Sequence, residues 1–371
     1  MPDALLVTSS FLPGRGGIES YLAELCDELR PRLAVLAPAV RDGRTVPRDA
    51  GYPIEGVSHT MLWPGRRVVA TTIAAAERHG TSRVLFGTPW PLLLAGPRLA
   101  RAGLRYGAIV HGAELTVPAA VPGLRRAIVH ALRGADVLFA VSSYTAGRVK
   151  ALLGDRRPAI EILRARVDLE RFRPEAAAEA PFARMGVPHD AAVILSFGRL
   201  VPRKGVDRLI RALPELCARV PNALLVVAGT GPQLDDLKRL AARERAPVVF
   251  AGRVPDEEAP AVYAAASVFA LPVADRWLGL EVEGLGVVLL EAAACGVPCV
   301  TGRSGGTPEA VIDGQTGFVV DARDQAALID RVAWLLENPV EARTLGAAGR
   351  AHVEGEFTQR PLPPSLLQWL G

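Results

Sequence analysis

Several features are scarce in this sequence of 371 residues, and each scarcity argues against a class of protein. Its apolar runs are broken by Gly, Pro or charged residues well before the roughly 18 consecutive residues that a membrane-spanning helix needs, so we expect no such helix. The four cysteines have no CxxC spacing, which argues against a zinc site or a disulfide framework and favours buried free thiols. Residues 1–8 lack the basic region and cleavage site of a secretory leader, so we expect a cytoplasmic protein.

Charge and aromatic content argue against nucleic acid as a partner. The formal net charge is only +4 and aromatic residues make up 5% of the chain. Such a small charge favours a local basic patch over a general basic coat. Basic and aromatic residues are not interleaved on the predicted strands, so no platform for stacking single-stranded bases is expected.

What the chain does contain is an alternation of short β-rich runs and helical stretches, which is typical of parallel sheets with crossover helices. The chain exceeds the roughly 250 to 300 residues at which a single core stops growing, so two α/β domains are expected. One series of strands begins at residues 4–8 and a second at residues 192–196, with a hinge in residues 168–187. The predicted parts are an N-terminal domain of residues 1–167, a C-terminal domain of residues 168–355 and a proline-rich tail of residues 356–371.

A glycine-rich turn follows the first predicted strand and leads directly into a helix. It contains Gly14, Gly16 and Gly17. Glycines there let backbone N–H groups approach a phosphate at the helix N-terminus, where the helix dipole favours negative charge. A tight turn that needs positive φ would use the same residues, so both interpretations stay open. The spacing is not the GxGxxG of dinucleotide binders, which argues against a dehydrogenase.

Two cations, Arg199 and Lys204, follow the first strand of the second series. Ligands of open α/β sheets bind at this carboxyl edge. Two cations there suit a diphosphate, because they can neutralise the charge that grows on a departing phosphate. A solvated loop would carry the same residues and is the alternative.

Two carboxylates lie eight residues apart, Glu283 before a glycine loop and Glu291 inside an apolar helical run. A carboxylate can accept two sugar hydroxyls, so one could hold a donor sugar and the other a ribose. The alternative is a first-turn helix charge at Glu283 and a surface carboxylate at Glu291. A Glu within so apolar a run is seldom buried unless it is paired.

Together these motifs resemble the retaining GT-B fold glycosyltransferases of family four, over the chain up to about residue 356. Gly16-Gly17, Arg199 with Lys204, and Glu283 with Glu291 carry the resemblance, followed by Cys295-Gly296-Val297-Pro298. The segments that look most like the actinobacterial phosphatidylinositol mannoside mannosyltransferases, which use GDP-mannose, are residues 196–205, 281–286, 304–309 and 346–354. The resemblance implies a GT-B fold, in which two Rossmann-like domains with parallel sheets face an interdomain cleft.

The resemblance also implies roles for individual residues. Taken alone, His111 at a strand end would serve as well as a structural histidine. The implied catalytic residues are His111, Arg199, Lys204 and Glu283. The implied donor-binding residues are Gly16, Gly17, Arg199, Lys204, Arg253, Val254, Glu283, Gly284, Leu285, Gly286 and Glu291. The implied acceptor-side residues are Gly16, Arg66, Arg67, Glu114, Arg125 and Arg126.

The expected activity is retaining transfer of a hexose, mannose from GDP-mannose, to an acceptor hydroxyl that approaches from the leaving-group side. The chain has no Asp-x-Asp motif, so neither a metal nor any cofactor beyond the nucleotide-sugar is expected. The expected acceptor is a phosphatidylinositol mannoside or related glycolipid, reached by peripheral contact of a basic N-terminal surface with the inner face of the plasma membrane. That surface could equally be a set of solvated helix faces.

Two alternatives stay open. One is transfer from a UDP- or GDP-sugar to a small soluble acceptor such as an aminocyclitol, an inositol phosphate or an antibiotic aglycone. The other is a catalytically inactive nucleotide-sugar-binding protein. Two departures from the family pattern favour the second slightly: Arg166 stands where the family has Gly, and the C-terminus is proline-rich.

Overall fold

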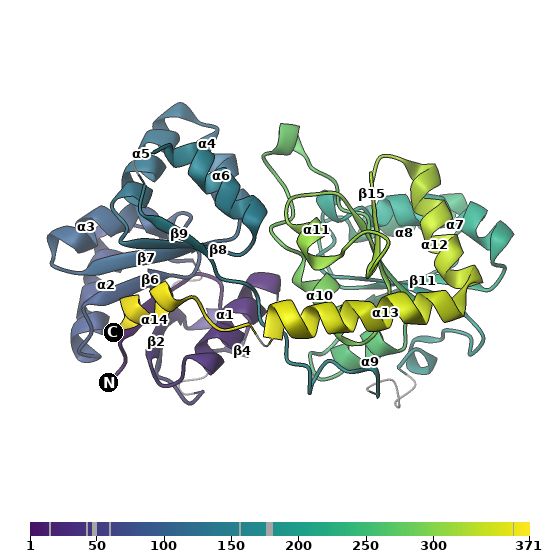
Figure 1. Cartoon of the computed structure of the whole chain (residues 1–371), viewed down its shortest axis with the longest axis horizontal. Coiled ribbons are helices and arrows are strands. Elements are labelled where there is room, and N and C mark those ends of the chain that lie inside the picture. The colour runs from purple at the N-terminus through teal and green to yellow at the C-terminus, as the bar shows by residue number, and fades with distance from the viewer. Residues whose placement is uncertain are drawn as a thin grey trace. The chain divides into compact units, whose positions relative to one another are not determined.

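The computed structural model describes residues 1–14, 16–41, 44–46, 50–58, 61–155, 157–175, 181–358 and 360–371. These residues form two compact units (Figure 1). Unit 1 is Met1–Arg166 with Pro361–Gly371, and unit 2 is Val167–Arg360. The expected tail is therefore divided, because residues 356–360 lie in unit 2 and the rest in unit 1. The Ala/Glu-rich part of the expected hinge, residues 176–180, lies outside the described residues.

Unit 1 is built on a parallel sheet of seven described strands in the order β5-β2-β1-β6-β7-β8-β9. Every residue of β1 is buried, which is typical of a parallel sheet covered on both faces. The elements are β1 (Ala4–Val7), α1 (Gly17–Glu28), β2 (Leu33–Pro38), β3 (Val40–Arg41), β4 (Arg44–Thr45), β5 (Ile54–Val57), α2 (Arg66–Arg78), β6 (Arg83–Phe86), η1 (Leu92–Ala95), α3 (Gly96–Arg101), β7 (Arg105–Val110), α4 (Ala113–Ala119), α5 (Pro122–Arg133), β8 (Val137–Ala140), α6 (Ser143–Leu153), β9 (Ala159–Ile162) and α14 (Pro364–Leu370).

Unit 2 repeats this architecture with six described strands in the order β12-β11-β10-β13-β14-β15, all parallel. The prediction of two parallel α/β units is confirmed. The elements are η3 (Ala183–Met185), β10 (Ala192–Phe197), η4 (Pro202–Lys204), α7 (Val206–Arg219), β11 (Ala223–Ala228), α8 (Leu234–Glu244), β12 (Val248–Gly252), α9 (Ala259–Ala264), β13 (Val268–Leu271), η5 (Trp277–Gly279), α10 (Val287–Ala294), β14 (Cys299–Gly302), α11 (Thr307–Ala310), β15 (Gly317–Val320), α12 (Gln325–Glu337), α13 (Pro339–Val353) and η6 (Glu354–Thr358).

The strand order of each sheet reverses beside its first strand. In unit 1 the chain leaves β1 toward β2 on one side and later returns to β6 on the other, and in unit 2 the same holds for β10, β11 and β13. Ligands of open α/β sheets bind outside the carboxyl ends of the strands at such switch points. The loops after β1 and β10, which carry Gly16 and Lys204, therefore occupy the expected ligand positions of their units.

The C-terminal segment completes unit 1. Leu366, Trp369 and Leu370 of α14 are buried, and the indole Nε1 of Trp369 donates to Asp136 Oδ2 at 3.1 Å. Pro364 is the first residue of this helix, a position that needs no N–H donor. None of the described helices is both long enough and apolar enough to cross a bilayer.

Helix α13 packs against the segment after α10 through a glycine. A Cβ at Gly346 would lie 1.9 Å from the carbonyl oxygen of Gly296, a distance that forces the backbone apart. We predict that Gly346→Ala lowers the free energy of unfolding by about 1–3 kcal/mol, because an added methyl in a packed interior strains it. The chemical denaturation midpoint of the purified variant measures this.

The matched control is Gly355→Ala in η6, where an added Cβ meets nothing within 4 Å. It should leave the midpoint unchanged or raise it slightly. Equal midpoints for the two variants would contradict the close approach of α13.

Candidate functional site

Glycines bring the loops at the carboxyl edge of the unit 2 sheet into close contact. Gly229, at φ +135°, lies so close to the loop after β10 that a Cβ there would fall 1.9 Å from Gly198 O. Gly205, at φ +72°, lies just as close to Pro272 O, where a Cβ would fall at 2.2 Å. Side chains are excluded at both positions, so the backbone after β10 is fixed against β11 and β13. This fixes the position from which Lys204 extends.

Lys204 and Glu283 form a buried ion pair. Lys204 Nζ lies 2.9 Å from Glu283 Oε2, and both residues are buried. Arg203 Nε approaches the same carboxylate oxygen at 3.3 Å. Burial by itself would raise the pKa of Glu283, but the charges of Lys204 and Arg203 outweigh it and hold that pKa below its usual value. The carboxylate is therefore ionised and accepts hydrogen bonds.

The charges continue outward from this pair in alternating sign. Arg203 also reaches Glu281 Oε1 at 3.5 Å, and Arg276 reaches Glu281 Oε2 at 3.0 Å. Sequence reasoning missed Arg203 and Glu281. A signal was present, since Glu281 and Glu283 lie two residues apart and alternate positions of an extended segment face the same side.

The backbone of Glu283 is also held in place. Its N–H donates to Ser304 Oγ at 3.1 Å, and its carbonyl accepts from Gly306 N–H at 3.0 Å. A Cβ at Gly305 would lie 1.9 Å from that carbonyl. Ser304 Oγ in turn donates to Asp275 Oδ1 at 2.5 Å. The carboxylate is thus preorganised by contacts to both its side chain and its main chain.

Glu291 lies on α10 and is paired as its apolar surroundings require. Its Oε2 accepts from the hydroxyl of Tyr263 at 2.7 Å, and the ring of Tyr263 stacks on Phe197 with centroids 4.9 Å apart. Burial raises the pKa of Glu291, and the Tyr263 hydrogen bond offsets this only in part. Burial, with the charge of Glu291, also raises the pKa of Tyr263, so the phenol remains a donor. The described residues make no hydrogen bond to Glu291 Oε1.

The remaining predicted donor residues of unit 2 lie on the same edge of the sheet. Arg199 is exposed, and its side chain makes no ion pair or hydrogen bond with the described residues. Arg253 is exposed and Val254 buried after β12. Gly284, Leu285 and Gly286 lead into α10, with Gly286 at φ +89° as its N-cap and no side chain capping the first turn. The free N–H groups of such a turn attract anions.

In unit 1 the glycine turn lies directly before α1. Gly16 is the N-cap of α1 in an extended conformation, and Gly17 is the first residue of the helix. Neither these glycines nor Gly14 has positive φ, so the interpretation that the turn needs positive φ is wrong for them. Arg15 lies outside the described residues.

His111 follows β7 and is fixed by contacts on two sides. Its Nε2 lies 2.8 Å from Gly87 O, and since a carbonyl only accepts, that nitrogen carries the proton. Its backbone N–H donates to Glu114 Oε1 at 2.6 Å, and its ring meets Tyr21 edge-on at 5.4 Å. In the neutral ring Nδ1 is left as an acceptor. The structure thus joins His111 and Glu114, two of the predicted residues.

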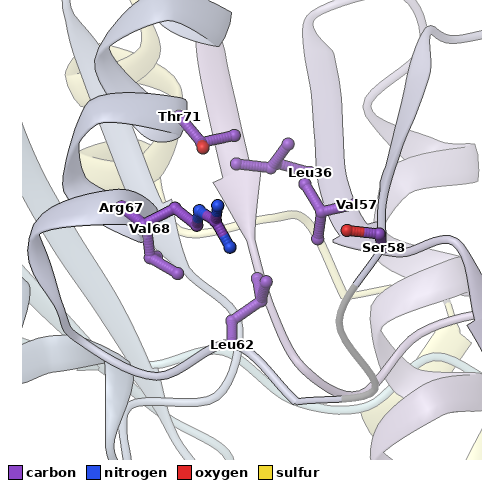
Figure 2. A pocket seen from close by; sticks show the side chains of 7 residues that line it. All are labelled: Leu36, Val57, Ser58, Leu62, Arg67, Val68 and Thr71. Carbon is purple, nitrogen blue, oxygen red and sulfur yellow. The ribbon is translucent and has the colours of Figure 1, made fainter.

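The predicted acceptor-side arginines occupy two separate helices of unit 1. Arg66 and Arg67 open α2, and both are exposed. Arg67 lines a pocket of about 260 Å³ at the carboxyl ends of β2 and β5, and its guanidinium extends among the lining side chains (Figure 2). Arg125 and Arg126 are exposed on α5. The other residues lining the pocket are Leu36, Val57, Ser58, Leu62, Val68 and Thr71.

Arg166, which stands where the family has Gly, is held by an ion pair. Arg166 binds Glu28 at the end of α1 through two hydrogen bonds, Nε–Oε2 at 2.8 Å and Nη2–Oε1 at 3.0 Å.

All four cysteines are free thiols, as the sequence predicts, and three of them are buried. Among the described residues, no cluster of His, Cys, Asp and Glu could hold a metal ion.

Comparisons with known proteins identify the family. The model for glycosyl transferases group 1 matches residues 179–352. The GDP-mannose-dependent alpha-(1-6)-phosphatidylinositol monomannoside mannosyltransferase of Mycolicibacterium smegmatis is 43% identical over 354 residues, which cover 93% of this chain and 92% of that protein. The chain belongs to the group 1 glycosyltransferases. As the resemblance implied, this glycosyltransferase is similar to the phosphatidylinositol mannoside mannosyltransferases over nearly its whole length.

Solved structures agree on the fold. The Anabaena protein Alr3699/HepE, in complex with UDP, matches with a TM-score of 0.80 at 21% identity, covering 96% of each chain. WaaG, a glycosyltransferase involved in lipopolysaccharide biosynthesis, matches with a TM-score of 0.72 at 19% identity, covering 95% of each chain. The predicted GT-B fold of this glycosyltransferase is thereby confirmed.

The raised pKa of Glu291 implies that the stability of the folded protein depends on pH. Because the folded state favours its protonated form, the wild-type glycosyltransferase loses stability as the pH rises from about 4.3, the usual glutamate pKa, through the raised value. Gln cannot ionise and still accepts from Tyr263. We predict that Glu291→Gln is more stable than wild type at pH 7, by a margin that shrinks toward pH 4, in thermal unfolding.

Glu215→Gln is the matched control, because Glu215 is exposed on α7. Its difference from wild type should change little over the same pH range. If Glu291→Gln is no more stable than wild type at pH 7, then burial does not disfavour the ionised form of Glu291.

Proposed function

We propose that this chain is a retaining mannosyltransferase that moves mannose from GDP-mannose to a hydroxyl of phosphatidylinositol monomannoside or a related glycolipid. The name and extent of the 43% identical relative support the donor and the acceptor class. The observation that carries the proposal is the buried Lys204–Glu283 pair, which places a cation and an ionised carboxylate side by side at the switch point of unit 2.

The donor is bound by groups of both charges. A lysine has three donors, and one of them binds Glu283, so two remain for the diphosphate. Arg199 supplies a second cation, and the N-terminal turn of α10 supplies N–H groups for the phosphate oxygens. The ionised Glu283 accepts from the hexose hydroxyls, and Glu291 Oε1 accepts from the ribose. The Arg253 and Val254 loop packs against the base.

Transfer proceeds on the face of the sugar that carries the leaving group. The acceptor hydroxyl attacks the anomeric carbon as the bond to the diphosphate breaks, and its proton passes to the departing phosphate oxygen. Attack on that face retains the α configuration of GDP-mannose, in keeping with the alpha linkage in the relative's name. Lys204 and Arg199 stabilise the charge on the departing GDP. His111 would contact the hexose through Nδ1, the ring nitrogen not bound to Gly87.

No divalent cation takes part in this proposal, because Lys204, Arg199 and the helix N-terminus neutralise the diphosphate. No other cofactor is required either, since GDP-mannose itself carries the activated sugar. The sequence contains no Asp-x-Asp motif of the kind that would bind a metal with the donor.

The glycolipid acceptor requires that the enzyme meet a membrane surface at the cytoplasmic face. Arg125 and Arg126 are exposed on α5, and Val121 at its N-cap is 51% exposed. Cations around an exposed apolar residue suit an anionic headgroup layer. We propose that this face of unit 1 makes the electrostatic contact with anionic lipid.

The transfer itself is tested with purified protein and phosphatidylinositol monomannoside. We predict transfer from GDP-mannose but not from UDP-glucose, and EDTA should not lower the rate. Turnover by Lys204→Ala should fall at least roughly 100-fold, because the leaving phosphate loses its charge partner. Lys238→Ala, on the exposed face of α8, is the control and should keep full activity. Near-normal turnover in Lys204→Ala, with an unchanged melting temperature in both, would place the phosphate site elsewhere. Transfer only to a small soluble acceptor such as inositol phosphate would overturn the glycolipid assignment.

The membrane contact is tested by sedimentation with phosphatidylinositol vesicles. We predict that replacing Arg125 and Arg126 together by Ala weakens binding roughly tenfold or more at low salt, because each surface arginine contributes about 1 kcal/mol. The difference should vanish at high salt, where such charges are screened. Replacing Arg239 and Arg243 of α8 is the matched control. Equal losses for the two pairs would show that net charge, and not this face of α5, determines binding.

A further inference from the structure

A short hairpin, residues 276–281, projects two apolar side chains from unit 2. An antiparallel bridge between Arg276 and Glu281 closes it, with Arg276 N donating to Glu281 O at 2.9 Å and Glu281 N to Arg276 O at 3.2 Å. Within the turn, Gly279 N donates to Arg276 O at 3.1 Å and Leu280 N to Trp277 O at 3.2 Å. The hairpin therefore satisfies much of its own backbone hydrogen bonding.

The tip of this hairpin is apolar and in contact with solvent. Leu278 is 106% exposed relative to the reference residue, and Trp277 is 57% exposed. The guanidinium of Arg276 lies 5.0 Å from the centre of the Trp277 ring. Leu278 is more exposed than any other large apolar side chain described in unit 2. Exposing large apolar side chains to water in this way is energetically unfavourable.

The backbone conformation of the tip is energetically unfavourable as well. Trp277 and Leu278 both have left-handed φ, at 51° and 54°. Residues with a Cβ avoid this region, and glycine adopts it freely. The chain nevertheless has two bulky residues here in succession. Strain of this kind is characteristic of functional positions, and here it coincides with two exposed apolar side chains.

We propose that the tip formed by Trp277 and Leu278 inserts into the interfacial layer of the lipid bilayer that carries the acceptor. This inference rests on the proposed function, since the acceptor there is a membrane glycolipid. Trp is enriched at bilayer interfaces, and Leu adds apolar surface that can enter the acyl region. The hydrogen bonds within the hairpin matter because a backbone entering lipid must satisfy its polar groups internally.

A bilayer suits this tip better than a second protein surface. Two side chains at a convex apex offer far less than the roughly 800 Å² per partner that a stable protein interface buries. A fluid lipid interface needs no matching cavity. Arg276, whose guanidinium lies against the Trp277 ring, is placed at the depth of the headgroups.

The base of the hairpin connects the tip to the donor site. Glu281 binds Arg276 on one side and Arg203 on the other, and Arg203 also binds Glu283. The chain then reaches Glu283 only two residues after the hairpin ends. A lipid surface held by the tip would thus lie close to the carboxylate assigned to the transferred sugar.

The decisive variant replaces Trp277 and Leu278 together by glycine. Glycine adopts left-handed φ without strain, so the hairpin should form and the melting temperature should stay equal or rise. Partitioning onto mixed phosphatidylcholine and phosphatidylinositol vesicles should fall about tenfold or more, since the apolar area of two large side chains is lost. The measurement is made at high salt, where the contribution of the unit 1 arginines is screened.

Two control variants accompany it. Replacing Trp277 by Phe and Leu278 by Met keeps the tip apolar and should retain vesicle binding. Val340→Ser removes another exposed apolar side chain of unit 2, 62% exposed on α13, and should have no effect. Binding by the glycine variant equal to wild type, or equal losses for Val340→Ser, would overturn the proposal.

Activity separates this inference from the proposed function. The glycine variant should lose transfer to phosphatidylinositol monomannoside in vesicles and keep transfer to its deacylated, water-soluble form. Equal loss on both acceptors would assign the tip to the catalytic site and overturn the membrane role. A wild type dimer that the glycine variant does not form would assign it to a second copy and also overturn the proposal. If the wild type transfers to neither acceptor, the proposed function fails, while the vesicle measurement still tests the tip.

Discussion

The candidate site depends on keeping one carboxylate ionised where water is largely excluded. A buried charge is tolerated only when it is paired and hydrogen-bonded, and Glu283 meets that condition through Lys204, Arg203 and the Ser304 to Gly306 loop. The pairing also fixes the position of Lys204, the residue that we propose binds the diphosphate. Removing Glu283 would leave Lys204 buried without this partner, whereas removing Lys204 would still leave Arg203 beside Glu283.

The two glutamates of the motif are placed in opposite environments. Cations dominate around Glu283 and lower its pKa, whereas Glu291 has a phenol as its neighbour and burial raises its pKa. An ionised carboxylate binds sugar hydroxyls strongly. Two identical side chains eight residues apart thereby acquire pKa values shifted in opposite directions by their surroundings alone.

Much of the architecture could be predicted from the sequence, because buried parallel strands are short apolar runs between turns. The expected first strands of the two series, residues 4–8 and 192–196, coincide with β1 and β10 to within one residue. Lys204 and Glu283 were found as members of motifs, but their contact was not predictable from spacing, since it joins residues 79 apart through tertiary packing. The same reason hid Tyr263 as the partner of Glu291. His111 was found through the family pattern, and only the structure shows which ring nitrogen is already bound to Gly87.

The return of the C-terminal segment to unit 1 affects how the chain is made. Unit 1 consists of the first 166 residues and the last eleven, and the indole of Trp369 bonds to Asp136 across this junction. During translation the N-terminal residues emerge first and begin to fold as a domain. Leu366 and Leu370, which are buried in that domain, leave the ribosome only after all of unit 2 has been synthesised. The first domain to emerge is therefore the last to be completed, because the apolar surface that α14 covers has no partner until the C-terminal residues are made.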